Sequence, residues 1–240
     1  MQPAAVLELE YAALFEHDAE GRLAAVDRHG NPAPDLTIGR TDGVVVVRLR
    51  GDLSDDLAAK LTALADRETA TASLEAPPAF DREYRRLLRM GDAAAEVYVA
   101  FVMEPSQRGG EPPDVVDIAT LDRAALAEFS GLGTGLEGRL PGFAVVRDGS
   151  AVAVTCCACS GDGAAEAGVE TLPRYRGRGY ATAVTAAWVE AVRRSGRVAF
   201  YSAAAENAAS LAVGRKLAGA PYAVMTHYRR PKRAGDRPAR

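Results

Sequence analysis

The sequence contains few cysteines and histidines, three of each among its 240 residues. Cys156, Cys157 and Cys159 all fall in the apolar stretch "TCCACS", with no histidine nearby. An odd number of crowded cysteines does not form a disulfide framework, and a zinc site needs further ligands. We therefore expect no metal site and buried strand thiols, with Cys157 and Cys159 on one face and Cys156 on the other. A reactive cysteine is the alternative.

The sequence also lacks long apolar runs and a strong charge of one sign. No run approaches the ~20 apolar residues that span a bilayer, and the N-terminal "MQPAAVLELEYAALF" has no basic region typical of a secretory signal. A net charge of −3 gives no indication of a dedicated nucleic-acid binder. Hydrophobic residues make up 48% and charged residues 25%. This composition is typical of a soluble globular protein, which we expect in the cytoplasm without membrane or nucleic-acid partners.

A run of proline, glycine and polar residues without periodicity, "EPSQRGGEPPD", predicts a linker over residues 104–114. It divides the chain into an N-terminal segment, residues 1–110, and a second domain, residues 114–228. The basic tail, residues 229–240, is expected to be a solvated, disordered end. A contact with nucleic acid or an acidic partner is the alternative for the tail.

The N-terminal segment has an α+β pattern. Apolar residues at helical spacing predict a helix over 4–15, and the β-branched "VVVVRLR" predicts a strand over 44–50. Ser54 is a candidate N-cap for a helix over 55–67. A further helix is expected in "FDREYRRLLRM" and a buried strand in "AEVYVAFVM". Nothing here groups into a catalytic constellation, since His17 and His29 lie in polar, turn-like sequence.

The second domain alternates strands and helices more regularly. Thr120 is a candidate cap for a short helix over 120–129, and Asp148-Gly149 predicts a tight hairpin turn between two strands. The stretch "SGDGAAEAG" is expected to form the next turn, followed by the strand "GVETL". The remaining pattern predicts a helix over 180–194 with Trp188 in the core, a strand in "RVAFYS", a helix over 208–217, and a last strand in "YAVMTHY".

The stretch "VETLPRYRGRGYAT" joins a strand to a helix through a turn that contains two glycines. Gly177 and Gly179 lack Cβ atoms, so an anion can approach the backbone closely. The first turn of the helix offers free N–H groups and the positive end of the dipole. Arg174, Arg176 and Arg178 add positive charge. Together these features predict a cradle for a phosphate or pyrophosphate; a tight turn without a ligand is the alternative. The spacing fits neither an NTPase P-loop nor the dinucleotide fingerprint.

This turn carries a family resemblance. "RYRGRGYA" is similar to the Arg/Gln-x-x-Gly-x-Gly/Ala motif of the GNAT acetyltransferases, with Arg174, Gly177 and Gly179 in its fixed positions. "FYSAAAENAASLAVGRKLAGAPY" resembles their second cofactor-contacting region, where Asn-x-x-Ser introduces a helix. The resemblance covers roughly residues 115–228 and implies a GNAT acyl-CoA N-acyltransferase fold there, within an α+β (mixed α/β) chain. The extra N-terminal segment resembles an actinobacterial group of GNAT proteins.

The resemblance implies acetyl-CoA as co-substrate and direct transfer of its acetyl group to an amine in a ternary complex. Backbone groups of Val169 and Thr171 would bind the pantetheine arm, and one N–H would serve as oxyanion hole. Asn207 and Ser210 would contact the arm from the other side. Asn207 as a helix cap alone, and Ser210 as a small first-turn residue, are the alternatives. The pyrophosphate would be held by the turn: Arg174, Arg176, Gly177, Arg178, Gly179, Tyr180, Ala181 and Thr182.

The proton-transfer residues are predicted less directly. Acyl transfer to an amine needs a base and often an acid for the leaving thiolate. The tyrosine that the family commonly supplies on its last helix aligns with Gly214 here, so Tyr201 and Tyr222 are the substitute candidates. For the base, Glu170 lies on the strand beside the expected reaction centre, with Glu166 and Glu206 as weaker candidates.

Three functions fit this pattern. The first is an acetyl-CoA-dependent N-acetyltransferase, whose amine acceptor the sequence does not specify and for which a homodimer is left open. The second, prompted by Gly214, is an acyl-CoA-binding or regulatory module without catalysis. The third takes "RYRGRGY" as an RNA-contacting segment, but the regular periodicity on both sides of it favours an ordered turn.

Overall fold

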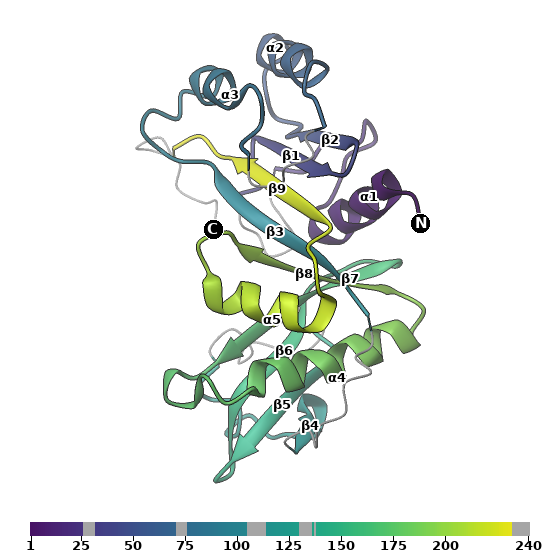
Figure 1. Ribbon diagram of the computed structural model, residues 1–240, viewed down its shortest axis with the longest axis vertical. Coiled ribbons are helices and arrows are strands. Elements are labelled where there is room, and N and C mark those ends of the chain that lie inside the picture. The colour runs from purple at the N-terminus through teal and green to yellow at the C-terminus, as the bar shows by residue number, and fades with distance from the viewer. Residues whose placement is uncertain (26–31, 71–75, 105–113, 130–135, 137, 232–240) are drawn as a thin grey trace. The chain divides into compact units, whose positions relative to one another are not determined.

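The computed structural model describes residues 1–25, 32–70, 76–104, 114–129, 136 and 138–231. The contacts divide the chain into two compact units, both drawn in Figure 1. The first unit comprises Met1–Glu8, Phe15–Tyr98 and Ala223–Arg240, and the second comprises Leu9–Leu14 and Val99–Tyr222. Residues 105–113 of the expected linker, 104–114, and residues 232–240 of the tail lie outside the described residues. Both units are discontinuous, whereas the boundaries proposed from the sequence are continuous.

In the described part of the first unit the strands follow the order β2-β1-β9-β3. They are β1 (Leu36–Thr41), β2 (Val44–Leu49), β9 (Ala223–Tyr228) and the first three residues of β3 (Glu96–Met103). β1 is antiparallel to both β2 and β9. Its helices are α2 (Asp55–Ala65), α3 (Asp81–Leu87) and the beginning of α1 (Pro3–Leu14).

Two features of the first unit differ from expectation. The sequence pattern missed β1, whose six residues are all buried, because Gly39 and Arg40 interrupt its apolar run. Arg40 is accommodated there by donating to the carbonyl oxygens of Ala76, at 2.5 Å, and Pro77, at 3.3 Å. Ser54 does occupy the N-cap position of α2, but its side chain makes no capping hydrogen bond.

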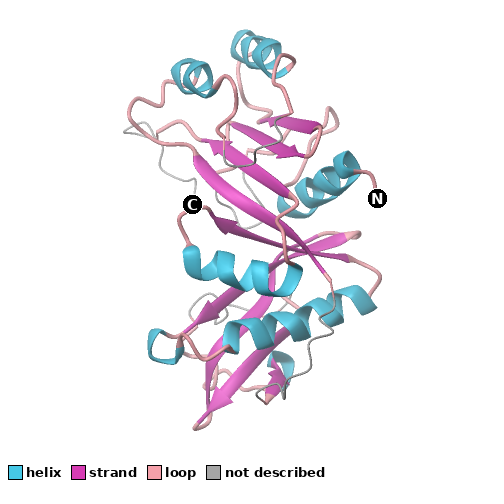
Figure 2. Ribbon diagram, viewed as in Figure 1, coloured by secondary structure: helices cyan, strands magenta, loops and turns pink. Residues whose placement is uncertain are grey.

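The second unit has the strand order β3-β8-β7-β6-β5-β4. β7 is antiparallel to β6 and parallel to β8. Helices α4 and α5 pack on the strands of this unit (Figure 2). Besides the end of β3, the elements are β4 (Val115–Asp117), the 3-10 turn η1 (Ile118–Thr120), β5 (Gly142–Arg147), β6 (Ser150–Ser160), β7 (Ala164–Thr171), the 3-10 turn η2 (Pro173–Tyr175), α4 (Tyr180–Arg194), β8 (Val198–Ala204) and α5 (Ala208–Ala218).

The expected helix over 120–129 is wrong. Asp117, rather than Thr120, caps the short turn η1 by accepting a hydrogen bond from the Ala119 N–H at 2.8 Å. Thr120 instead donates its hydroxyl to the Asp117 carbonyl, and Asp122 accepts from the Ala125 N–H. These local side-chain bonds offer the backbone an alternative to the helix.

The central strand pair also departs from simple alternation. β7 begins at Ala164, so the expected turn is confined to residues 161–163. A bulge in β6 pairs Cys157 with Ala167 and Cys159 with Glu166. Because neighbours on β7 point to opposite faces, Cys159 lies on the face opposite Cys157, and the expectation that they share a face is wrong. The two fully buried thiols are Cys156 and Cys157; burial raises the pKa of both.

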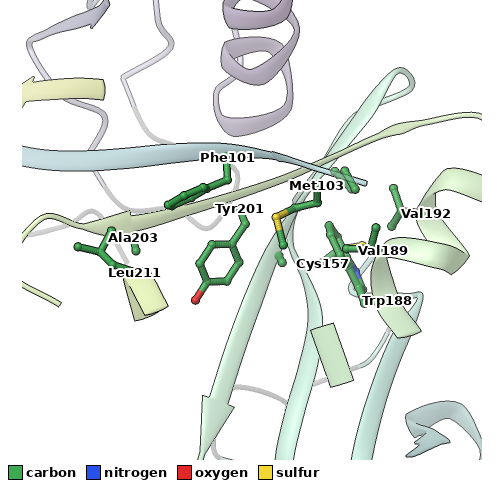
Figure 3. Packing of buried hydrophobic residues seen from close by; sticks show 12 residues of the cluster. Phe101, Met103, Cys157, Trp188, Val189, Val192, Tyr201, Ala203 and Leu211 are labelled. Atoms are coloured by element: carbon green, nitrogen blue, oxygen red, sulfur yellow. The ribbon is translucent and has the colours of Figure 1, made fainter. Parts of the chain in front are cut away.

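The main core of the second unit lies between α4, α5 and the strands (Figure 3). Trp188, as expected, is fully buried there. It packs in one cluster with Cys157 of β6 and Phe101 and Met103 of β3. Figure 3 shows Tyr201 on β8 with its hydroxyl directed away from Phe101. This packing fixes the end of β8 beside α5, where the candidate site lies.

Candidate functional site at the fork between β7 and β8

β7 and β8 separate part-way along their length. Their parallel pairing runs only from Ala164 and Val198 to Glu166 and Phe200. Beyond that point Val169, Glu170 and Thr171 line a pocket of about 480 Å³. Its other lining residues come from the glycine turn, the first residues of α4, the end of β8 and α5: Tyr175, Arg176, Gly177, Gly179, Tyr180, Ala181, Thr182, Tyr201, Asn207, Ala209, Ser210, Ala212, Val213 and Lys216.

The glycine turn presents the start of α4 to this pocket. Gly179 is the N-cap of α4 and adopts a left-handed conformation, with φ 80°; Gly177 has φ 76°. Side chains rarely adopt these angles, so glycine is required by the backbone itself. A Cβ at either glycine would meet no atom within 4 Å, which leaves space for a ligand. The free N–H groups of the first helical turn therefore face an open anion site.

The three arginines of the turn have different surroundings. Arg176 lines the pocket and donates from Nε to the Thr171 carbonyl at 3.1 Å. Arg174 lies outside the lining and pairs with Glu128 at 2.5 Å; this hydrogen bond lowers the pKa of Glu128. Arg178, also outside, donates to the Arg174 carbonyl. Both outer guanidinium groups stack on the Tyr175 ring, at 5.2 and 5.3 Å from its centre.

Ten of the twelve residues predicted to contact the cofactor thus line this pocket, all except Arg174 and Arg178. Lys216 of α5, which no sequence pattern indicated, adds a second cation to the lining. A lysine one turn from the end of a helix gives no signal by itself, because such residues are common on solvated faces.

Asn207 and Ser210 form the start of α5. The Asn207 side chain caps the helix by accepting from the Ser210 N–H at 3.0 Å, so the capping named in the alternative for this residue is present. Both residues also line the pocket. Capping and ligand contact are therefore compatible for Asn207.

Tyr201 is the candidate proton donor that lies in the pocket. Its hydroxyl is 2.5 Å from the Ser210 hydroxyl and 3.3 Å from the Ser210 carbonyl oxygen. Burial raises the pKa of Tyr201 and the negative charge of Glu166 adds to this, while the Ser210 hydrogen bond acts in the opposite direction. The phenol is therefore protonated at neutral pH and able to donate.

The other candidates lie elsewhere. Tyr222 is outside the pocket lining, and its hydroxyl donates to Glu10 of α1. Glu170 lines the pocket and is exposed, whereas Glu206 is exposed and outside the lining. Glu166 is buried at the end of the paired region, where its Oε1 accepts from the Ser202 N–H at 2.5 Å and from the Ser202 hydroxyl at 2.7 Å. Among the described residues no three ligating side chains come close enough to hold a metal ion.

Packing against Phe101 explains why position 214 is a glycine. A Cβ built on it would lie 2.6 Å from Cε2 of Phe101 and 2.7 Å from its Cδ2. The Phe101 ring therefore occupies the volume into which a side chain at position 214 would project. The absence of a tyrosine here reflects this close contact between α5 and β3.

Residues 125–228 match the model of the GNAT acetyltransferase family. This GNAT segment runs to the end of β9 and contains the fork, the glycine turn and the whole pocket lining. It contains neither Glu10 nor Phe101. Together with the strand order it confirms the expected mixed α+β fold, with a GNAT fold in the C-terminal half.

Several solved GNAT structures are similar to the chain at low identity. A GNAT-family acetyltransferase from Novosphingobium aromaticivorans is 22% identical over 55% of this chain and 63% of its own, with a TM-score of 0.45. One from Colwellia psychrerythraea is 15% identical over 95% of this chain and 96% of its own, with a TM-score of 0.47. One from Kribbella flavida is 18% identical over 59% and 60%, with a TM-score of 0.44.

This chain therefore spans less than two thirds of the length of the Novosphingobium and Kribbella proteins. A comparison with curated proteins finds no match. Within the parts of the chain that the structure describes, no helix has the length and apolar character needed to cross a bilayer.

Replacing Gly214 by alanine should destabilise the protein by about 1–3 kcal/mol, because the new methyl group overpacks against Phe101. Urea unfolding followed by circular dichroism measures the loss. Adding Phe101→Leu should recover part of it, so that the two changes are coupled. Full stability of Gly214→Ala, or strict additivity of the pair, would contradict this account of the packing.

Burial raises the pKa of Glu166 to about 7 from an ordinary 4.5. Its contribution to stability is therefore fully present below pH 4.5 and is lost as the pH rises through 7. The free energy of unfolding of the parent, relative to Glu166→Gln, should fall by roughly 3 kcal/mol over this window. Groups that do not interact with Glu166, such as the buried His227, are common to both proteins and cancel in the difference. Glu10, whose pKa the charge of Glu166 raises, would not cancel, so both proteins carry Glu10→Gln. A pH-independent difference would show that Glu166 titrates normally.

Proposed function

We propose that the chain transfers an acetyl group from acetyl-CoA to an amine acceptor, by direct attack in a ternary complex in the cytoplasm. The observation that carries the proposal is the pocket itself. A single pocket is lined by three parts of the chain: residues 169–171 of β7, which do not pair with β8, the glycine turn at the start of α4, and the start of α5 with the Ser210 hydroxyl. These are the three parts that the family resemblance assigned to one cofactor.

The residues present fit coenzyme A in their chemistry. The N–H groups around Gly177 and Gly179 would hold the diphosphate, with Arg176 and Lys216 supplying positive charge. Backbone groups of Val169 and Thr171, freed from the β8 ladder, would hydrogen-bond the pantetheine arm, and Asn207 and Ser210 would contact it from α5. Bound acetyl-CoA would supply the reactive thioester.

The pocket also supports a division of the proton transfers. Tyr201 would donate its proton to the thiolate that leaves, since its hydroxyl is protonated and lies within the pocket. Glu170 would act as base on the acceptor ammonium, since it is the exposed carboxylate of the lining. One N–H of the β7 segment would stabilise the oxyanion.

The alternative of a module that binds without catalysis was prompted by Gly214. The packing of Phe101 accounts for that glycine, and Tyr201 offers a hydroxyl from β8 in place of the missing tyrosine. An enzyme is therefore the function that the site supports best.

Charge-reversing substitutions test whether Arg176 and Arg178 contribute differently to coenzyme A binding. Arg176→Glu should weaken coenzyme A binding about tenfold or more, because it replaces a lining cation next to the diphosphate. Arg178→Glu, two residues away and outside the lining, is the matched control and should have a much smaller effect. Isothermal titration calorimetry measures both. Equal affinities for all three proteins, or no binding by the parent at millimolar coenzyme A, would remove the basis of the proposal.

Tyr201→Phe should lower kcat about 100-fold with little change in coenzyme A affinity, since it removes only the donated proton. The assay is thiol release from acetyl-CoA with a panel of amines. Tyr222→Phe tests the rival candidate under the same conditions. A large loss for Tyr222→Phe together with an active Tyr201→Phe would reverse the assignment, and coenzyme A binding without any turnover would favour the binding module.

A further inference from the structure

Four arginines of the first unit lie together at α3 and the turn that follows it. They are Arg82, Arg85, Arg86 and Arg89, whose spacing of three, four and seven residues from the first places them on one side of the helix and its end. With Gly91 they line an open pocket of about 430 Å³. Among the described residues no carboxylate belongs to this lining. We refer to the four residues as the arginine cluster.

The opposite side of α3 is anchored in a core. Tyr84 and Leu88 are fully buried and pack in one cluster with residues of β1, α2 and β9. The hydroxyl of Tyr228, on β9, donates at 3.0 Å to Oδ1 of Asp81, the first residue of α3. This packing fixes the helix, so the backbone positions of the arginine cluster are set before any ligand arrives.

Little within the described residues neutralises the positive charge of the cluster. Oδ2 of Asp81 lies 3.6 Å from Nη1 of Arg85. The other three arginines are exposed, and no hydrogen bond or ion pair joins them to any part of the chain that the structure describes. Glu83 and Asp92, the two other acidic residues of this stretch, are exposed and lie outside the lining. The guanidinium groups are therefore available to an anion.

Arg89 adopts a backbone conformation that normally favours glycine. Its φ is 52°, in the left-handed region. Its N–H donates to the Arg86 carbonyl at 3.1 Å, and the next N–H, of Met90, donates to the Arg85 carbonyl at 3.0 Å. This pair of bonds is the Schellman arrangement at a helix end, in which the left-handed residue is usually glycine. An arginine at this position is strained where a glycine would not be.

The charges of α3 are also only partly suited to the helix. Arg85 and Arg86 lie in the last turn, which the helix dipole favours. Arg82 is the second residue of the helix, where the positive end of the dipole disfavours a cation. It also lies four residues before Arg86, a spacing at which like charges repel. Stability of the fold therefore does not explain the cluster, and strain of this kind is typical of ligand sites.

We propose that the arginine cluster binds the phosphate groups of an oligophosphate, a diphosphate or a triphosphate. Guanidinium groups bind phosphate oxygens through paired, charge-assisted hydrogen bonds. Four of them line the pocket and Asp81 offsets one, which matches a ligand with several negative charges better than a single phosphate.

The lining recognises phosphate rather than a base or a sugar. Among the described residues it holds no aromatic or apolar side chain on which a base could stack. The ligand is therefore the oligophosphate part of a nucleoside triphosphate or an inorganic polyphosphate. No residue of this lining belongs to the pocket at the fork, so the inference does not rest on the proposed transferase function.

The central experiment is calorimetric titration of the full chain with sodium tripolyphosphate. All proteins carry Arg176→Glu, so that the glycine turn contributes little to the signal. Arg89→Gly should weaken tripolyphosphate binding about tenfold or more, because one guanidinium is lost. The same variant should unfold at a higher urea concentration, because glycine relieves the left-handed strain. Unchanged affinity, or unfolding at a lower urea concentration, would overturn the proposal.

A second variant separates the site from the overall charge of the protein. Arg82→Gln should also weaken tripolyphosphate binding about tenfold. Arg123→Gln, an exposed arginine outside both linings, removes the same charge and is the matched control. It should leave the affinity unchanged. Equal losses in the two variants would show a general effect of charge and would overturn the site.

Three further ligands test the chemistry of recognition. Orthophosphate should bind about tenfold more weakly than tripolyphosphate, because it meets fewer guanidinium groups; equal affinities would overturn the proposal. ATP with an affinity comparable to that of tripolyphosphate supports a nucleoside triphosphate as the source, and weaker binding of ATP supports an inorganic polyphosphate. A single-stranded oligonucleotide that binds more tightly than both would assign the surface to nucleic acid instead and would reject the oligophosphate site.

Discussion

The hydrogen bond from the Ser202 N–H to the Glu166 carboxylate marks the point where β7 and β8 separate. A continued parallel ladder would use backbone acceptors for the N–H groups of β8, but at Ser202, two residues after the last paired residue Phe200, a side chain is the acceptor. The next residues of β7 are thereby left with backbone groups that face a pocket. The site depends on this one substitution of a side chain for a backbone partner.

The glycine turn and the fork support each other. The turn places the start of α4 at the open end of the fork, and Trp188 anchors the same helix in the core. Arg174 and Arg178 stack on Tyr175 rather than entering the pocket, and so stiffen the turn from outside. Of its three arginines, Arg176 alone lines the pocket. A fixed framework with one inward cation is suited to holding an anionic ligand without reorganisation.

Local patterns allowed much of this to be predicted. The apolar stripe and glycine start of α4 gave its bounds, Tyr180–Arg194, correctly. Asp148 and Gly149 form the expected turn with φ 51° and 77°. The features that the sequence did not predict depend on contacts between residues far apart in the chain. The bulge in β6 turns Cys159 to the opposite face, and the buried Arg40 interrupts the apolar pattern of β1. Glu10 contacts Tyr222 only through tertiary packing. No short-range signal encodes such pairings.

Phe101 and Glu10 show that the second compact unit begins before the family-matched segment. Both residues precede the family-matched segment, yet Phe101 packs in the core against α5 and Glu10 accepts a hydrogen bond from the Tyr222 hydroxyl. A fragment cut at residue 125 would lack β3, which borders β8, and the helical residue that accepts from Tyr222. The second unit is therefore assembled from separated stretches of the chain, and its bounds do not coincide with those of the family-matched segment.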